Sequence, residues 1–556
     1  MRFRQAFRTD IFIFAATLFI VAVCNVTFWR QLLDAVSPHS AYDYLFIAAI
    51  AVLACLLLGL FMSLFAAPYV FKPAIIVLLL ITASASYFTS EYGTVVDGGM
   101  LKNVLQTNTN EVADLLTIKL ALYVLALGVL PSALLSAFPI AYRPLRSKLR
   151  FRARLALVAG MVCIVLGLVF SQNILSVFRQ HRLLLGLFAP LNVVSASAEL
   201  ARKSFRFRPD GTGPFGDDAQ KSSAWSTRRK RSVTVIVVGE TARADHFALN
   251  GYPRATNPLL AKIPNLVSFT QAYSCGTNTG HSLPCMFSGL GANSFNSERA
   301  ARQENLLDML KRAGFSVLWR ENQAGCYGVC KRVATDVLER AGTRTLFERG
   351  ESFDENLVRG LQEKIESMQG DTVIVLHMMG SHGPTYYKRY PPGFEHFQPA
   401  CKESQFSRCD LSDIINSYDN TLVYSDYVLA KLVELLQAND RNGLSTGMIY
   451  LSDHGESLGE SNIYLHGMPY RLAPAAQKHI PLLLWLSSNY QSELGADIEC
   501  LKGRREQPVS HDNLFHSVLG LLDVQTRTYD RDLDIFASCR GMLPAPASTS
   551  ASEHTR

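Results

Sequence analysis

Long apolar runs separated by short polar connections fill the first part of the chain. A helix needs about 20 apolar residues to cross a bilayer, and five runs meet or approach that length: 11–29, 44–65, 73–88, 118–138 and 155–170. Arg2, Arg4 and Arg8 precede the first run, which is long and lacks a small-residue cleavage site. We therefore interpret the first run as a retained signal anchor rather than a removed signal peptide.

Charge in the loops between these runs predicts their orientation. Arg and Lys gather at the N-terminus and in the 139–154 loop, whereas the 89–117 loop carries four acidic residues against Lys102. Basic loops stay in the cytoplasm, so the 89–117 loop should face outward. Five spans then place everything after about residue 171 outside the cytoplasm.

From Ser232 onward the period changes to short apolar runs alternating with amphipathic stretches. Strands are predicted at 233–238, 316–319, 372–376, 448–451 and 481–485, and helices at 305–313, 356–368, 412–437 and 512–522. This order is typical of a mostly parallel sheet with helices on both faces. We expect a five-helix transmembrane domain (1–171), a connecting segment (172–231), an α/β domain (232–543) and a disordered Ala/Ser/Pro-rich tail (544–556).

The connecting segment has two predicted parts. Residues 176–187 and 195–206 form candidate amphipathic helices at the membrane surface. Residues 209–225 are rich in Gly, Ser and Asp and are typical of a flexible linker.

Composition agrees with a membrane protein. Hydrophobic residues make up 48% of the chain and charged residues only 18%, and the mean hydropathy is +0.12. The formal net charge of +7 would suit a nucleic-acid partner, but the basic block at 143–154 explains the excess as a cytoplasmic loop. We therefore expect no nucleic-acid partner.

The cysteines fall into two groups. Three of the 11 lie singly in apolar runs, and the other eight follow residue 270 in four plausible pairs: Cys275/Cys285, Cys326/Cys330, Cys401/Cys409 and Cys500/Cys539. Local pairs predict disulfides and an oxidising compartment. Zinc binding by Cys326 and Cys330 is the weaker alternative, because no second pair at zinc-finger spacing lies nearby.

Acidic and histidine side chains follow three of the predicted strands. Glu240 follows 233–238, and the Asp453–His454 pair follows 448–451. His377 and then His382 follow the strand at 372–376. Ligands bind beyond the carboxyl ends of parallel strands in open sheets, and Glu, Asp and His are the residue types that bind zinc.

The segment 274–285 supplies the candidate nucleophile. It contains Thr277, Thr279 and His281 between two cysteines, and a helix is predicted from Pro284 to Leu290. A hydroxyl near a helix N-terminus can become a metal-activated nucleophile that carries a phosphoryl group. The simpler interpretation is a disulfide-closed turn with an N-cap threonine.

Two further histidines lie in Gly-flanked turns. His382 in Gly-Ser-His-Gly-Pro and His466 in Leu-His-Gly-Met-Pro could contact phosphate oxygens, protonate a leaving alcohol or hold a second metal. His377 and His281 are better interpreted as structural.

These motifs together resemble the lipid A phosphoethanolamine transferases, a family of chromosomal and mobile colistin-resistance enzymes. The similar segments are 238–246, 275–288, 380–384, 452–460 and 464–469, and the resemblance covers nearly the whole chain. It implies an alkaline-phosphatase/sulfatase-like α/β/α catalytic domain in the periplasm, anchored in the bacterial inner membrane. It also implies a monomer that takes phosphoethanolamine from phosphatidylethanolamine and gives it to lipid A.

The resemblance assigns roles by motif position. Thr279 is the implied nucleophile, and Glu240, Thr279, Asp453 and His454 are the implied ligands of one tightly bound zinc. The positions implied to contact substrate or hold a second zinc are His382 and His466. In the outward loop, a lipid-donor-contacting pattern falls on Asn103, Thr107 and Glu111, whose spacing of four predicts one helix face.

One position departs from the pattern. Several relatives carry Lys where this chain has Tyr327. A lysine can pair with a phosphate, but a tyrosine can only hydrogen-bond, so the way in which the donor or acceptor phosphate is held is in question.

Other functions remain open from the sequence alone. The acceptor could be a core sugar of lipopolysaccharide or a periplasmic glucan, and the reaction could be phosphoglycerol transfer or sulfatase-like hydrolysis. A membrane-anchored binding protein would require Glu240, Asp453 and His454 to be structural, and it would contain no zinc.

Overall fold

The computed structural model describes residues 6–106, 109–181, 183–206, 213–228, 230–323, 325–338, 347–348 and 351–540. The chain forms two compact units. The membrane unit comprises residues 1–208 with two later segments, 404–408 and 459–472, and the sheet unit comprises the remainder. The predicted tail at 544–556 lies outside the described residues.

Among the described residues of the membrane unit, four helices are long and apolar enough to cross a membrane. They are α3 (Ala41–Ser63), α4 (Phe71–Tyr92), α9 (Leu145–Val169) and the segment Ile118–Ala137, which combines α7 (Ile118–Val124), a π-helical turn (Leu125–Val129) and α8 (Leu130–Ala137). The pair α1 (Thr9–Val23) and α2 (Val26–Val36), bent by 58°, gives a fifth span if it is counted as one. The five predicted apolar spans are therefore found when the bent pair is counted as one.

The first predicted span, at 11–29, is interrupted by a bend, because α1 ends at Val23 and α2 begins at Val26. The buried side chain of Asn25 lies at the bend between α1 and α2 and donates to the carbonyl oxygens of Ile20 and Ala189, each at 2.8 Å. Its Oδ1 accepts from the Ala189 N–H, also at 2.8 Å. An amide that replaces backbone hydrogen bonds in this way is a recognised cause of a sharp helix kink.

The ends of α4 lie at opposite ends of the membrane unit. At its start, Lys72 donates to the carbonyl oxygens of Ser136 and Phe138. Strand β1 (Phe7–Arg8) pairs with β2 (Ile140–Ala141), so the N-terminus, the start of α4 and the basic 139–154 loop share one end. The last turn of α4 and Gly93 therefore belong to the opposite end, which the loop charges predict to face outward.

Shorter helices complete the membrane unit: α5 (Gly98–Gln106), α6 (Thr109–Leu115), α10 (Ser171–Gln180), α11 (Leu184–Leu187) and α12 (Leu191–Arg206). The prediction of one helix at 176–187 is wrong, because α10 ends at Gln180 and α11 begins at Leu184. The second connecting helix is present as α12.

The sheet unit is built on eight strands in the order β15-β5-β14-β11-β4-β10-β6-β7. Their bounds are β4 (Ser232–Gly239), β5 (Val267–Tyr273), β6 (Ser316–Glu321), β7 (Ala334–Val337), β10 (Thr372–His377), β11 (Ser445–Ser452), β14 (His479–Leu486) and β15 (Val509–Ser510). All neighbours are parallel except β14, which is antiparallel to both β11 and β5. The five predicted strands are confirmed, whereas β5, β7 and β15 were not predicted.

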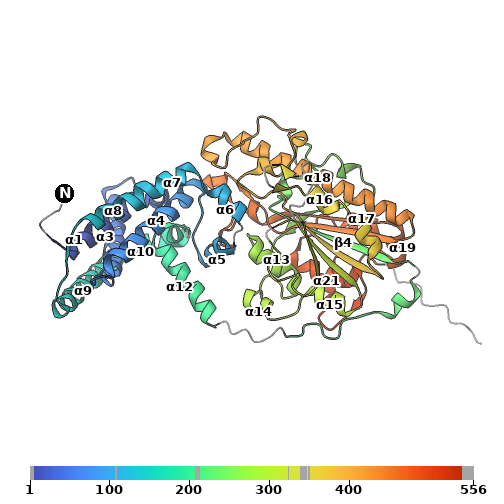
Figure 1. The fold of residues 1–556 in the computed structure, drawn as a ribbon, viewed down its shortest axis with the longest axis horizontal. Coiled ribbons are helices and arrows are strands. Elements are labelled where there is room, and N and C mark those ends of the chain that lie inside the picture. The colour runs from blue at the N-terminus through green and yellow to red at the C-terminus, as the bar shows by residue number, and fades with distance from the viewer. Residues whose placement is uncertain are drawn as a thin grey trace, which may run out of the picture. The chain divides into compact units, whose positions relative to one another are not determined.

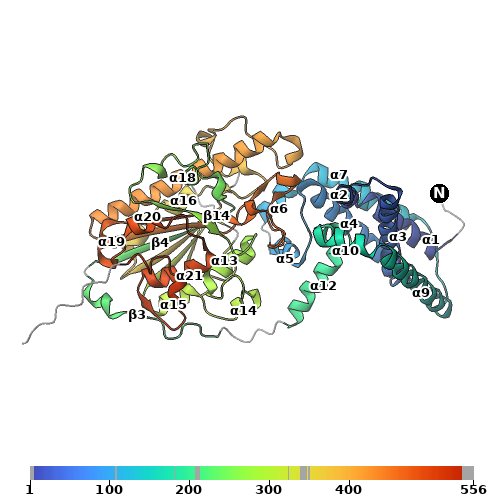
Figure 2. The ribbon, with the colours of Figure 1, turned by 180° about the vertical axis from the view of Figure 1, so that it is seen from behind.

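Helices cover both faces of this sheet, as expected for an α/β/α unit (Figure 1). On one side lie α13 (Thr279–Ser288), α15 (Leu306–Arg312) and α21 (His511–Leu521), and on the other lie α16 (Glu355–Val358), α17 (Leu361–Ser367) and α18 (Leu411–Arg441); Figure 2 shows the same layers from behind. The short helix α19 (Ser488–Leu494) places its buried Tyr490 in the core cluster of the first side. The predicted helix at 356–368 is split at Gly360, whose φ of +68° suits glycine.

All four predicted cysteine pairs form disulfides, at Cys275–Cys285, Cys326–Cys330, Cys401–Cys409 and Cys500–Cys539. The alternative zinc site at Cys326 and Cys330 is therefore wrong. Cys24, Cys55 and Cys163 are free; Cys55 lies in α3 and Cys163 in α9, whereas Cys24 directly follows α1.

Candidate active site

The adjacent strands β4 and β11 bring the first candidate ligands together. Gly239 at the end of β4 lies opposite Ser452 at the end of β11, and the next residues along the chain are Glu240 and Asp453. The Asp453 N–H donates to the Gly239 carbonyl oxygen at 3.0 Å. The parallel register therefore delivers two carboxylates to one edge of the sheet.

Thr279 reaches the same edge as the first residue of α13. Asn278 caps the helix, because its side-chain oxygen accepts from the His281 N–H at 3.0 Å. The predicted helix from Pro284 to Leu290 is wrong: α13 begins at Thr279, and Pro284 lies inside it. The hydroxyl therefore lies at a helix N-terminus, where free N–H groups and the helix dipole favour negative charge.

The four predicted ligands form one cluster. Thr279 Oγ1 lies 3.1 Å from Glu240 Oε2 and 3.4 Å from His454 Nε2. His454 Nε2 lies 3.2 Å from Asp453 Oδ2 and 3.4 Å from Glu240 Oε1. Glu240, Asp453 and His454 are fully buried, and Thr279 is 8% exposed.

Glu240, Asp453 and His454 fit a metal ion. One possible ligand atom from each residue lies within 4.8 Å of the others. His454 Nδ1 lies 2.9 Å from the Gly455 carbonyl oxygen, which can only accept, so Nδ1 carries a proton and Nε2 faces the carboxylates. Asp453 Oδ2 is buried and accepts no hydrogen bond within the described residues, as expected for an oxygen that a cation would coordinate.

The electrostatics of the cluster also favour a cation. Burial raises the pKa of Asp453, and the nearby Glu240 carboxylate raises it further. Burial lowers the pKa of His454, but the carboxylates of Asp453 and Glu240 raise it by more. Both shifts show an excess of negative charge in a site without solvent, which a divalent metal would neutralise.

The comparisons with known proteins decide the family. Residues 232–524 match the model of the Sulfatase family, and residues 53–205 match the model described as Phosphoethanolamine transferase EptA/EptB. Phosphoethanolamine transferase EptA of Escherichia coli (strain K12) is 40% identical over 527 residues, which cover 94% of this chain and 95% of that protein. The chain belongs to the EptA family of phosphoethanolamine transferases.

Two further relatives agree. Phosphatidylethanolamine transferase Mcr-1 of Escherichia coli is 37% identical over 497 residues, which cover 87% of this chain and 90% of that protein. The solved structure of the integral membrane protein lipooligosaccharide phosphoethanolamine transferase A (EptA) from Neisseria meningitidis matches with a TM-score of 0.92 and 34% identity, covering 96% of this chain and all of that one. This member of the EptA family is therefore a transferase and an integral membrane protein, with a membrane unit and a sulfatase-like catalytic unit.

The loops that carry the cluster are fixed by neighbours that the sequence analysis missed. The buried His511 accepts a hydrogen bond from the Cys275 N–H at 3.2 Å and donates one to the Ser452 carbonyl oxygen at 2.9 Å. Gln323 donates from Nε2 to Glu240 Oε2 at 2.9 Å. Gln323 follows the end of β6, so a search for polar residues beyond the carboxyl ends of the strands could have found it. No local sequence pattern indicates His511.

Gly380 and Gly455 bring backbone unusually close to the cluster. A Cβ on Gly380 would lie 2.6 Å from the Glu240 carbonyl oxygen. A Cβ on Gly455 would lie 2.0 Å from the Ala476 carbonyl oxygen. Both glycines are therefore needed to close the loops on which Glu240 and His454 lie.

The remaining predicted residues fall in different parts of the chain. His382 follows β10 in the sheet unit and is 8% exposed. Asn103 lies on α5, Glu111 on α6 and His466 in the 459–472 segment of the membrane unit. Thr107 lies outside the described residues, so the single helix face proposed for the outward loop is not tested.

Three other residues singled out in the sequence lie in the sheet unit. His377 is fully buried, and its Nδ1 lies 2.8 Å from Glu321 Oε1. A buried histidine bonded to a carboxylate is typical of a structural role. His281 packs edge-on against Phe295. Tyr327 is partly buried against the core cluster and has a φ of +47°.

Proposed function

We propose that this protein transfers phosphoethanolamine from phosphatidylethanolamine to a phosphate of lipid A through a phosphothreonine at Thr279. The observation that carries the proposal is the position of the Thr279 hydroxyl, at a helix N-terminus and 3.1 Å from Glu240 in a buried acidic cluster. The relatives support the transferred group and the donor: one is named a phosphoethanolamine transferase and another a phosphatidylethanolamine transferase.

The reaction would proceed in two displacements. Thr279 Oγ1 attacks the phosphorus of the donor, its proton leaves through the adjacent Glu240, and the bond from phosphorus to the diacylglycerol oxygen breaks. Diacylglycerol departs after its oxygen takes up a proton. A phosphate oxygen of lipid A then attacks the phosphothreonine and releases the Thr279 oxygen, which regains a proton. Covalent catalysis of this kind divides one difficult transfer into two easier steps.

Glu240, Thr279, Asp453 and His454 would hold one zinc ion in this scheme. Bound zinc would supply Lewis-acid stabilisation and would lower the pKa of the Thr279 hydroxyl. The N-terminus of α13 favours the negative charge that develops on the transferred phosphoryl group. His382 and His466 are proposed to contact the phosphoethanolamine or to hold a second zinc, and Asn103, Thr107 and Glu111 are proposed to contact the lipid donor.

The compartment follows from two separate observations. Four disulfides lie in the sheet unit, which indicates an oxidising compartment. The basic 139–154 loop would remain in the cytoplasm. We therefore propose an inner-membrane protein, acting as a monomer, with its sheet unit in the bacterial periplasm.

The proposed product predicts a phenotype. Adding an ethanolamine group to a lipid A phosphate places a positive charge beside an anionic one. Cationic peptides such as polymyxin and colistin then lose charge-assisted contacts, each worth about 1.5–3 kcal/mol. Resistance to these peptides should therefore accompany expression of the active enzyme.

Mass spectrometry of lipid A from a host that expresses the chain tests the proposal. We expect a gain of one phosphoethanolamine unit with the intact protein and none with Thr279→Ala. Thr277→Ser is the matched control, since it changes the other threonine of the same loop and should retain the gain. If lipid A is unmodified while a core sugar or a periplasmic glucan carries the group, lipid A is rejected as the acceptor. If the Thr279→Ala protein still modifies lipid A, Thr279 is rejected as the nucleophile.

A further inference from the structure

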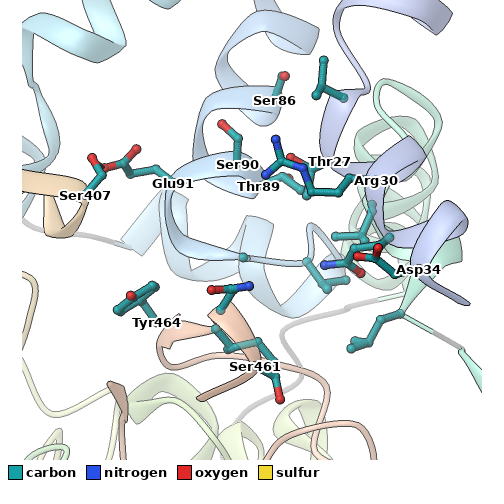
Figure 3. Close-up of a pocket in the computed structure, with 18 of the residues that line it drawn as sticks. Thr27, Arg30, Asp34, Ser86, Thr89, Ser90, Glu91, Ser407, Ser461 and Tyr464 are labelled. Atoms are coloured by element: carbon teal, nitrogen blue, oxygen red, sulfur yellow. Dashed lines mark hydrogen bonds between the residues drawn. The ribbon is translucent and has the colours of Figure 1, made fainter. Parts of the chain in front are cut away.

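A cavity of about 750 Å³ lies within the membrane unit. Its walls come from α2, the end of α4, the start of the segment Ile118–Ala137, the region of α11 and the two later segments of the unit (Figure 3). The α4 residues that line it run from Ser86 to Gly93. The cavity therefore lies at the end of the membrane unit opposite to the basic loop, which is the end that the loop charges predict to face outward.

Two of the charged side chains that line this cavity are exposed and have no partner among the described residues. Arg30 and Asp34 line it from one face of α2, four residues apart. Neither side chain forms an ion pair or hydrogen bond within the described residues, although an Arg–Asp pair at this spacing can interact. In contrast, Glu91 and Lys119 in the same wall pair with each other, and Ser407 Oγ donates to Glu91 Oε1 at 2.6 Å. The cavity therefore offers one guanidinium and one carboxylate to a ligand.

Hydroxyl groups surround the guanidinium. Thr27, Ser86, Thr89 and Ser90 line the wall beside Arg30, and Figure 3 shows the Arg30 guanidinium turned towards Thr89 and Ser90. A guanidinium among hydroxyls is a common environment for a phosphate group. Asp34, one helical turn further along α2, can accept from an ammonium group.

An apolar edge leads out of the cavity. Val23, Val26 and Leu183 are among its lining residues, and Val23 and Val26 are 44% and 53% exposed. These side chains occupy the bend between α1 and α2, where the first apolar helix ends. Acyl chains attached to a headgroup in the cavity could therefore continue along the apolar surface of the membrane unit.

We propose that this cavity binds the zwitterionic headgroup of a phospholipid, with its phosphodiester at Arg30 and its ammonium at Asp34. The ligand class is a phosphoethanolamine lipid with its acyl chains directed past Val23 and Val26. An anionic lipid without an amine would leave Asp34 unpaired beside its negative charge, so the site should disfavour it. The identification of this lipid with the donor rests on the proposed function, whereas the binding itself does not.

Native mass spectrometry of the full-length protein in detergent tests this site. The protein would carry Thr279→Ala, so that bound lipid is not consumed, and would be equilibrated with phosphatidylethanolamine or phosphatidylglycerol. We expect phosphatidylethanolamine to be retained preferentially. Arg30→Gln should reduce retention of both lipids about tenfold, because one charge-assisted contact is worth about that factor, and Arg30→Lys should restore part of the loss.

The second variant tests the amine contact. Asp34→Asn should abolish the preference for phosphatidylethanolamine and leave phosphatidylglycerol retention equal or higher. Arg146→Gln and Glu499→Gln, which remove exposed charges elsewhere, are the matched controls and should change neither. The proposal would be overturned by unchanged retention in both test variants, by an equal loss in the controls, or by preferential retention of phosphatidylglycerol in the Thr279→Ala protein. If phosphatidylethanolamine is retained but the wild-type protein, which keeps Thr279, does not modify lipid A, the proposed function is rejected instead.

Discussion

His511 donates a hydrogen bond from Nε2 to the carbonyl oxygen of Ser452 at 2.9 Å, one residue before Asp453 and His454, the proposed metal ligands. Its other ring nitrogen accepts from the Cys275 N–H in the loop that precedes Thr279. This imidazole therefore joins the nucleophile loop to the ligand loop. It can do so only as a neutral ring, because a protonated Nδ1 could not accept from Cys275.

The first prediction follows from the titration of His511. Burial lowers its pKa from 6.5 to about 4, so the folded protein disfavours a proton that the unfolded chain accepts below pH 6.5. The free energy of unfolding therefore carries no penalty from His511 above pH 6.5. As the pH falls from 6.5 towards 4, protonation of His511 in the unfolded chain lowers this free energy by up to about 3 kcal/mol. Thermal unfolding of wild type and His511→Asn between pH 7 and pH 4 measures it.

The gap in stability between these two proteins should shrink as the pH falls through this range. His479→Asn, which removes a half-buried histidine that contacts the Thr270 carbonyl oxygen, is the control. A gap that stays constant from pH 7 to pH 4 would show that His511 acts only through packing.

Gln323 should contribute to metal affinity although it is not a ligand. Its side chain donates to Glu240 Oε2 at 2.9 Å, and its N–H donates to Glu321 Oε1 at 2.9 Å. Loss of a group that orients a ligand typically costs 10- to 100-fold in metal affinity. Competition with a zinc chelator should therefore show about a tenfold weaker affinity for Gln323→Ala. Gln271→Ala, which removes a half-buried glutamine of β5 that accepts from the Tyr273 hydroxyl, should leave the affinity intact. Equal affinities in the two variants would remove Gln323 from this role.

Gly455 should be intolerant of even one methyl group. A Cβ there would meet the Ala476 carbonyl oxygen at 2.0 Å, and the displaced loop carries His454 and the carbonyl oxygen that fixes its tautomer. We expect Gly455→Ala to lose most of its bound zinc when assayed by elemental analysis. Gly503→Ala, where a Cβ meets nothing within 4 Å, should keep a full complement. Full zinc occupancy in Gly455→Ala would mean that the loop relaxes without moving its ligand.

The buried pair of Glu321 and His377 should behave as a unit. Burial raises the pKa of Glu321, but the charge of His377 and the hydrogen bonds from His377, Trp319 and Gln323 together lower it by more. Removing one member leaves an uncompensated buried charge, which costs about 3–5 kcal/mol. His377→Gln and Glu321→Gln should each be strongly destabilised in denaturant unfolding, and the double variant should be destabilised by clearly less than their sum. Additive losses would show that the two side chains are not coupled.

The sequence predicts most of the sheet and the four residues that cluster at its edge because both depend on local patterns. Buried parallel strands are recognisable as apolar runs, and the residue after such a run must lie at the edge of the sheet, as Glu240 and Asp453 do. The start of α13 was missed because Pro284 suggested a helix beginning, while Asn278 supplies the actual cap. Strand β5 was missed because polar residues interrupt it.

Other features depend on contacts between residues far apart in the chain. The bend at Asn25 depends on its side-chain amide, which bonds to the backbone of Ala189. No sequence pattern near residue 25 predicts that partner. The same holds for His511, which meets Cys275 and Ser452 only after the chain has folded. Segments 404–408 and 459–472 likewise join the membrane unit although their own composition is not that of a membrane span.

The wide spacing of Glu240, Thr279 and Asp453 along the chain has a consequence for biogenesis. A ribosome must add 212 residues after Glu240 before Asp453 is made, and strand β11, which aligns the two carboxylates, is completed just before that point. A nascent chain that is already exported up to residue 440 has the nucleophile but only part of the ligand set. Metal acquisition should therefore come late, after translocation, and retained zinc should serve as a reporter of complete folding.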